Sequence, residues 1–261
     1  MGIKQKIMGS LVPFVGNICK APTVLPVIYY HDIVNDGEGY SYMRTDVSRF
    51  EEQMKYLSEA GYKTLLFSEL PKEMDKKRNE KAVLITFDDG FLSNYTVAFP
   101  IMKKYGLKFN VYLAYDYIGT ENYMSKEQLL EMQESGIVEF GYHTKSHCDS
   151  RTLTDERLFE EELVEGKRLL EELLSRKVND YCFPYGYYSK EVIGMVDERG
   201  LFDRMYTSNY VKPTRLKNSI VCGRIGIHTN WQIDAFKKHL SGKYRIMHYY
   251  SKLRVGVPKV K

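Results

Sequence analysis

The sequence has 261 residues with a formal net charge of +4, and 43% of its residues are hydrophobic. A chain of this length and composition buries a large core as one large or two small domains. No apolar run approaches the ~20 residues that a membrane-spanning helix needs. The four cysteines form no C-x-x-C pair, which predicts free thiols in a reducing compartment rather than a disulfide framework.

The charge is unevenly distributed along the chain. Residues 1–31 carry three lysines and no acid, and residues 235–261 carry eight lysines and arginines and no acid, which leaves the middle at −7. A nucleic-acid-binding protein usually carries its positive charge on the folded body, so this pattern argues against nucleic acid as a partner. It favours an acidic folded body with two basic ends that bind an anionic surface, and the candidate partner is an anionic membrane.

The two ends of the chain have separate patterns. Residues 3–18, within an N-terminal segment 1–21, place apolar side chains at helical spacing around Pro13. Three interpretations of this segment are open: a secretory signal, a membrane-surface helix, or a helix packed on its own domain. The broken apolar core disfavours the secretory signal. The tail 236–261 interleaves basic and aromatic residues and either contacts lipid or is solvated.

We expect a cytoplasmic protein, free or peripheral on the inner face of the cell membrane. Flotation with anionic vesicles that is lost on deleting residues 1–20 or 236–261 would support the membrane contact, and flotation unchanged by both deletions would contradict it.

Between these ends, strand-like and helix-like segments alternate. Helices are predicted over 48–61, 68–76, 94–105, 125–136, 154–175, 189–199 and 231–240, two of them opened by capping boxes at 48–51 and 125–128. Strands are predicted over 24–30, 64–67, 82–87, 108–113, 137–141, 181–183, 204–207 and 221–227. Alternation implies parallel strands with right-handed crossovers. Residues 22–235 are therefore predicted to form one α/β domain, a distorted or incomplete (β/α) barrel with seven to eight parallel strands.

Polar residues follow the ends of several predicted strands. They are His31-Asp32, Asp88-Asp89, His143 with His147, Pro184-Tyr185-Gly186 and His228. The carboxyl ends of parallel barrel strands share one face, where active sites lie. Two adjacent carboxylates after a buried strand are costly unless a metal, a proton or a cation neutralises them. Four of the six histidines at the same positions favour a metal site over ordinary structural histidines.

His143 and His147 are four residues apart, so one tight turn aims both imidazoles at the same point. Two histidines and one carboxylate make a three-ligand set with open positions, which is typical of catalytic Zn²⁺ sites; Co²⁺ and Ni²⁺ also bind such a set. The second carboxylate then stays free as a base for water. A serine hydrolase is disfavoured because G-x-S-x-G is absent from the sequence.

Three motifs in this order resemble the polysaccharide deacetylases, carbohydrate esterase family four, also called the NodB homology domain: TFDDG (86–90), HTKSH (143–147) and FPYG (183–186). PVIYYHDIV (26–34) is also similar, and the resemblance covers residues 22–235. It implies a metal-dependent hydrolase that removes the N-acetyl group of an N-acetylhexosamine. The substrate is then an acetylated amino-sugar glycan: a polysaccharide, an oligosaccharide or a lipid-linked glycan precursor.

The resemblance also implies a role for each matched residue. Asp88 is the general base, Asp89, His143 and His147 are the metal ligands, and the backbone N–H of Tyr185 is the oxyanion donor. The histidine that protonates the leaving amine is either His31, as in the biofilm poly-N-acetylglucosamine deacetylases, or His228, as in the NodB-like order. We favour His31.

One departure from the family pattern concerns the base. Cys182 stands where the usual third motif carries an arginine that orients the base, so another group must hold Asp88. An O-acetyl esterase or small-amide hydrolase remains an alternative, as does a catalytically idle glycan-binding module, which the complete acid and histidine set disfavours. Several aromatic residues are candidates for stacking on sugar rings, although most must simply pack: Tyr115, Tyr117, Tyr142, Tyr185, Tyr187, Tyr188 and Trp231.

Overall fold

The computed structural model describes residues 25–38, 41–70, 81–209, 211–227 and 231–240. The predicted N-terminal segment 1–21, His228 and residues 241–261 of the basic tail lie outside the described residues. Within the described part, no helix combines the length and the apolar character needed to cross a bilayer.

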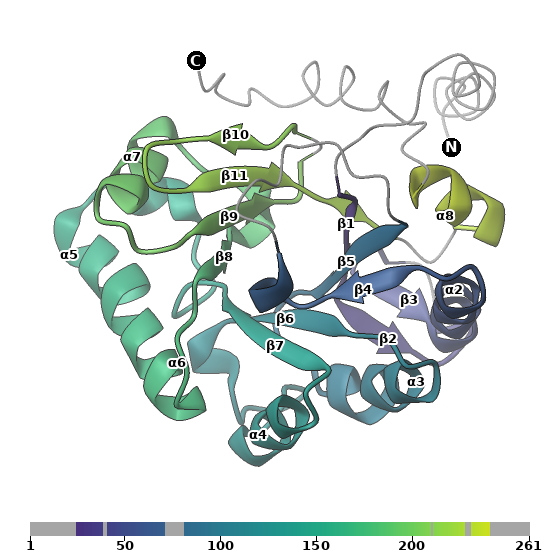
Figure 1. Cartoon of the computed structure of the whole chain (residues 1–261). Helices are drawn as coiled ribbons and strands as arrows, with labels where there is room; N and C mark the ends of the chain where they lie inside the picture. The colour runs from purple at the N-terminus through teal and green to yellow at the C-terminus, as the bar shows by residue number, and fades with distance from the viewer. Residues whose placement is uncertain (1–24, 39–40, 71–80, 210, 228–230, 241–261) are drawn as a thin grey trace.

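The strands form a curled, mostly parallel sheet that is ringed by helices (Figure 1), which confirms the predicted α/β class and distorted barrel. The order along the sheet is β10-β11-β9-β8-β7-β6-β5-β1-β12, and β4 also pairs with β5. Two short strands, β2 and β3, form a separate parallel pair. The strands are β1 (Val27–Tyr30), β2 (Asp32–Val34), β3 (Arg44–Asp46), β4 (Lys63–Leu65), β5 (Ala82–Phe87), β6 (Phe109–Leu113), β7 (Val138–Tyr142), β8 (Asp180–Cys182), β9 (Arg204–Thr207), β10 (Thr214–Arg215), β11 (Ile220–Gly223) and β12 (Ile225–Gly226).

One interrupted strand joins the two ends of this sheet. β11 pairs with β9 and β12 pairs with β1, both in parallel. The continuous strand predicted over 221–227 is therefore wrong at Arg224, where the chain changes its pairing partner. The Arg224 side chain is only 2% exposed. A charged residue is thus placed inside the barrel at the point where the sheet closes.

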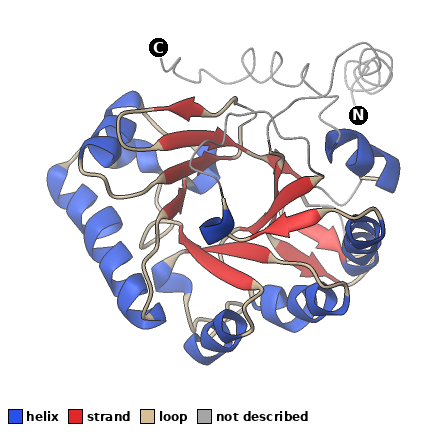
Figure 2. Ribbon diagram, viewed as in Figure 1, coloured by secondary structure: helices blue, strands red, loops and turns tan. Residues whose placement is uncertain are grey.

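Helices lie on the outside of the sheet (Figure 2). They are α2 (Val47–Glu59), α3 (Phe99–Lys104), α4 (Lys126–Glu134), α5 (Glu156–Phe159), α6 (Gly166–Leu174), α7 (Lys190–Glu198) and α8 (Ile233–Leu240). Two π-helices, η2 (Asn94–Ala98) and η5 (Glu160–Glu165), precede α3 and α6 directly. The helix predicted over 154–175 is confirmed as a continuous helical segment over 156–174, but the prediction missed the π-helix in its middle. π-Helical turns are rare in proteins, and those that occur are often found at functional sites.

The two predicted capping boxes had different outcomes. The box at Ser125 is confirmed, because the Ser125 N–H donates to Gln128 Oε1 over 2.8 Å and the Gln128 N–H donates to Ser125 Oγ over 3.4 Å. The box at Ser48 is wrong, because α2 begins at Val47 with Asp46 as its N-cap. The Ser48 N–H instead donates to Asp36 Oδ1.

A short 3-10 turn, η1 (Phe67–Glu69), packs against the amino-terminal half of the barrel. The Phe67 N–H donates to Asn110 Oδ1 over 2.9 Å, and Arg204 Nη2 donates to the Phe67 carbonyl over 3.1 Å. Arg204 also forms a two-bonded ion pair with Asp180, at 2.5 and 2.7 Å. Because Asp180 and Arg204 begin β8 and β9, these contacts lie at the end of the barrel away from the predicted site.

Candidate active site

The candidate site lies at the carboxyl ends of the strands. All six residues of β5 are buried, and Asp88 and Asp89 follow them with exposures of 3% and 4%. Asp89 has φ of 70°, a left-handed conformation that costs a non-glycine residue about 1–3 kcal/mol. Gly90 follows with φ of 81°, and a Cβ there would lie 2.7 Å from Leu113 Cδ2. The tight turn therefore needs glycine and directs the two carboxylates to different neighbours.

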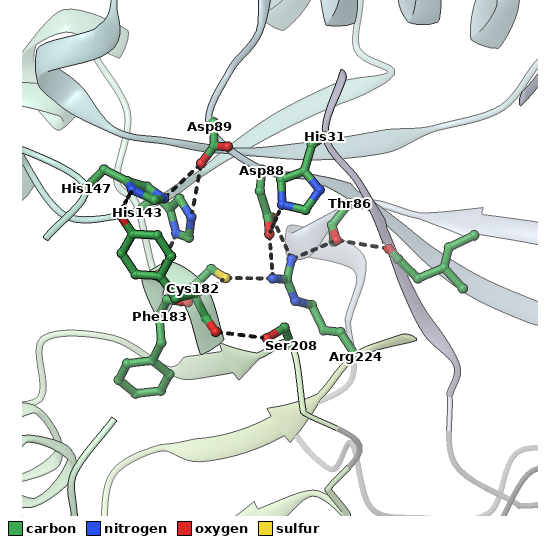
Figure 3. Close-up of polar contacts among 12 residues, drawn as sticks. His31, Thr86, Asp88, Asp89, His143, His147, Cys182, Phe183, Ser208 and Arg224 are labelled. Atoms are coloured by element: carbon green, nitrogen blue, oxygen red, sulfur yellow. Dashed lines mark hydrogen bonds and ion pairs between the residues drawn. The ribbon is translucent and has the colours of Figure 1, made fainter. Parts of the chain in front are cut away.

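Asp89 faces two imidazoles from the loop that follows β7 (Figure 3). Nε2 of His147 lies 3.1 Å from Asp89 Oδ1, and Nε2 of His143 lies 3.4 Å from the same oxygen. That buried oxygen has no hydrogen-bond partner among the described residues. Three ligand atoms that converge in this way suit a small divalent cation, and two nitrogens with one oxygen fit zinc and its first-row neighbours. The donor set therefore fits the implied metal.

Groups behind the two histidines orient their rings. His143 Nδ1 lies 2.7 Å from the Cys182 carbonyl, which only accepts, so this nitrogen carries the proton and Nε2 faces Asp89. His147 Nδ1 lies 3.2 Å from the Tyr185 hydroxyl. Burial opposes a charged His143, yet the neighbouring Cys182, Asp89 and Asp88 raise its pKa well above the ordinary value. Burial would raise the pKa of Asp89, but His143 and His147 hold it far below the usual range. Both shifts reflect the mutual attraction between this carboxylate and the imidazoles beside it.

We predict that His147→Ala lowers the affinity for Zn²⁺ by more than about 100-fold, because even outer partners of metal ligands account for 10–100-fold. The matched control is His31→Ala. This change also removes an imidazole from the site, but that imidazole contacts Asp88 and not the Asp89 oxygen on which His143 and His147 converge. Competition with a chromophoric chelator measures both affinities. Equal affinities for the two variants would contradict the ligand set.

Asp88 is bound by Arg224, which reaches it from the interruption between β11 and β12 (Figure 3). Nη1 donates to Asp88 Oδ1 over 2.6 Å, and Nη2 donates to Asp88 Oδ2 over 2.7 Å. Nη1 also donates to Thr86 Oγ1 over 3.1 Å, and Nη2 lies 2.8 Å from Cys182 Sγ. Arg224 thus places a guanidinium beside Cys182, the position at which the family pattern described above has an arginine.

Sequence reasoning did not identify Arg224 as a site residue. A signal was present, since this arginine interrupts an otherwise apolar strand and has a glycine on one side. Burial would raise the pKa of Asp88, but the charge and hydrogen bonds of Arg224 more than offset it and lower the pKa. Asp88 is therefore kept ionised and fixed in orientation, which is what a carboxylate base requires.

His31 lies on the other side of Asp88, with Nε2 3.8 Å from Asp88 Oδ2. Its backbone carbonyl accepts a 2.8 Å hydrogen bond from Asn94 Nδ2, on the π-helix η2. Burial lowers the pKa of His31 despite the raising effect of Asp88 and Asp89. His228, the other candidate for the acid, lies outside the described residues.

Of the seven predicted rim aromatics, Tyr115 and Trp231 are partly buried against the core, and the other five divide into two groups. Tyr142 and Tyr188 are buried at 0% and 6% exposure, so their proposed contact with sugar rings is wrong and they pack in the core. Tyr185 has φ of 59° and an exposed side chain whose ring lies 4.7 Å from that of His147. The Tyr117 ring stacks on His147 with the ring centroids 5.7 Å apart, and the Tyr187 ring lies 6.1 Å from that of Tyr185. These three rings flank the metal-ligand set.

The chain is similar to known proteins in sequence and in fold. A family model described as polysaccharide deacetylase matches residues 75–201. The protein named "Putative polysaccharide deacetylase YxkH" from Bacillus subtilis (strain 168) is 34% identical over 181 residues, which cover 69% of this chain and 63% of that protein. The chain thus spans less than two thirds of this relative's length.

Two further matches cover more of the chain. A poly-beta-1,6-N-acetyl-D-glucosamine N-deacetylase of Staphylococcus aureus (strain MSSA476) is 26% identical over 212 residues, which cover 76% of this chain and 72% of that protein. A crystal structure of a polysaccharide deacetylase from Bacillus cereus superposes with a TM-score of 0.72 and 26% identity, and covers 83% of this chain and 69% of that one.

Proposed function

The chain belongs to the polysaccharide deacetylase family, and from this premise we propose that it is a metal-dependent hydrolase of N-acetyl groups. The substrate class is an acetylated amino-sugar glycan, either a polymer, an oligosaccharide or a lipid-linked precursor. One observation carries the proposal: two imidazole nitrogens converge on one buried oxygen of Asp89, beside a second carboxylate that a guanidinium binds. The name of the Staphylococcus aureus relative supports the N-acetylglucosamine class.

The contacts of these residues and the family resemblance support a role for each. Asp89, His143 and His147 would hold the metal. A divalent metal bound there would supply Lewis-acid polarisation of the acetyl carbonyl and would make a nearby water more acidic. Asp88 accepts the proton of the attacking water at a carboxylate oxygen that Arg224 keeps ionised. The backbone N–H of Tyr185 donates to the oxygen on which negative charge develops.

The bond to nitrogen breaks only if the leaving amine receives a proton. We propose His31 as the donor, because its Nε2 lies 3.8 Å from Asp88 Oδ2 and Asn94 holds its backbone. His31→Ala is therefore expected to lower kcat by about 10²–10⁴-fold, the usual contribution of a general acid. His228→Ala is expected to remain near normal turnover. The reverse order of the two variants would transfer the role to His228.

The function is tested by mass spectrometry of acetylated amino-sugar oligomers and of a lipid-linked N-acetylhexosamine, incubated with zinc-loaded enzyme. Loss of the acetyl mass from at least one of them is expected, with Asp88→Asn as the inactive control. Acetyl loss from O-acetylated sugars alone would identify an esterase. Binding of the glycans without any acetyl loss would identify an idle glycan-binding module.

A further inference from the structure

The loop that carries both histidines has an unusual backbone. Thr144 and His147 adopt left-handed conformations with φ of 64° and 61°, which residues other than glycine rarely adopt. Such conformations persist only where the surroundings determine them. The shape that brings both imidazoles to Asp89 must therefore be held by groups outside the loop.

Glu162 accepts three hydrogen bonds from this loop. Its Oε2 accepts from the Lys145 N–H over 3.1 Å and from the Ser146 N–H over 3.0 Å, and its Oε1 accepts from Ser146 Oγ over 2.6 Å. The residue is only 5% exposed. The Lys145 ammonium lies 3.2 Å from Glu161 Oε1 instead. The three donors to Glu162 all come from Lys145 and Ser146, two of the three residues between the histidines.

The π-helix η5 brings Glu162 to this position. The Tyr142 hydroxyl donates to the Glu162 backbone carbonyl, so the residue just before His143 binds the same helical turn. Gly166, which follows η5, lets the loop come close, because a Cβ there would lie 2.8 Å from Lys145 Cβ. The wide turn and the glycine together allow one glutamate to bind the loop through its side chain and its backbone.

We propose that Glu162 is a positioning residue for the metal ligands. It fixes the loop at Lys145 and Ser146 so that His143 and His147 are aimed at Asp89 before the metal binds. This inference rests on the metal site of the proposed function and adds a residue that lies outside the TFDDG, HTKSH and FPYG motifs. Groups behind a metal ligand typically change affinity by 10–100-fold when they are removed.

The test measures Zn²⁺ affinity by chelator competition and the thermal midpoint of the metal-free protein. Glu162→Ala is expected to weaken Zn²⁺ binding by about 10–100-fold, and Glu162→Gln, which keeps one acceptor oxygen, is expected to lie in between. The matched control is Glu161→Ala, whose exposed side chain contacts only the Lys145 ammonium within the loop, and it is expected to bind Zn²⁺ like the unaltered protein. The visible spectrum of the Co²⁺-loaded protein is expected to change in Glu162→Ala and not in the control.

Three outcomes distinguish the claims. A lower thermal midpoint for folded Glu162→Ala with unchanged Zn²⁺ affinity would mean a merely structural role and would overturn the inference. If Glu162→Ala does not fold, an unaltered affinity of Glu162→Gln overturns it equally. Failure of the unaltered protein to bind Zn²⁺ would refute the metal site itself, and with it the proposed function.

Discussion

Arg224→Met is expected to lower kcat for acetyl release by about 10²–10⁴-fold, the contribution of a correctly held acid–base group. The reason is geometric and electrostatic, since the two terminal nitrogens of Arg224, Nη1 and Nη2, bind the two carboxylate oxygens of buried Asp88. Breaking a buried pair by removing one partner also costs stability, about 3–5 kcal/mol. Steady-state release of acetate and chemical unfolding measure the two effects separately.

Arg204→Met is the matched control for this prediction. Arg204 makes an equally short two-bonded pair with buried Asp180, but at the amino-terminal end of the barrel. It is expected to lose comparable stability and to keep near-normal kcat at a temperature where it is folded. Equal kcat losses in the two variants would mean that Arg224 acts only through stability. In the Arg224→Met background, Cys182→Arg is expected to restore part of the rate, because Cys182 Sγ lies 2.8 Å from Arg224 Nη2.

Asp88→Asn is expected to lower kcat by about 10²–10⁴-fold while the protein keeps its Zn²⁺ affinity within a few-fold. The carboxamide has nearly the same size but accepts no proton at neutral pH. The proposed ligand set is Asp89, His143 and His147, so the change leaves that set complete; Asp88 converges with His143 and Cys182 in a second group, which the affinity measurement tests. Acetate release and chelator competition are the two measurements.

Asp32→Asn is the control for the base. Asp32 follows His31 on the same face, yet it contacts Ser93 and Arg44 instead of the metal ligands. Its kcat is expected to stay within a few-fold of normal. A variant Asp88→Asn that keeps more than a tenth of the activity would exclude Asp88 as the base, and a concurrent loss of Zn²⁺ would assign it to the metal.

Much of the fold, and the gathering of the acids and histidines at one end of the barrel, could be predicted from the sequence. Strand-like and helix-like segments alternate along the chain, and glycines end several of the helices. Such alternation predicts parallel strands, because each helix carries the chain back across the sheet to the start of the next strand. The ends of such strands meet on one face whatever the details of packing, so Asp88, Asp89, His143 and His147 were expected to gather there.

The errors have a common cause. The interruption at Arg224, the π-helix after Phe159 and the burial of Tyr142 each depend on which distant element packs against the segment. Local periodicity contains no information about that neighbour, so a strand that changes partners has the same pattern as one that does not. The capping box at Ser48 failed for the same reason, since Ser48 binds Asp36 instead.

The sequence by itself determined which acids and imidazoles gather at the carboxyl ends of the strands, because these residue types and their short spacings are local properties. Only the tertiary structure decided what supports them. Arg224 and Asp88 are 136 positions apart, and Glu162 is 16 positions from the nearer loop residue that it binds. Their pairing follows from barrel closure and from a helix that lies over the loop. These arrangements are set by the packing of the whole chain and are not written in any one segment.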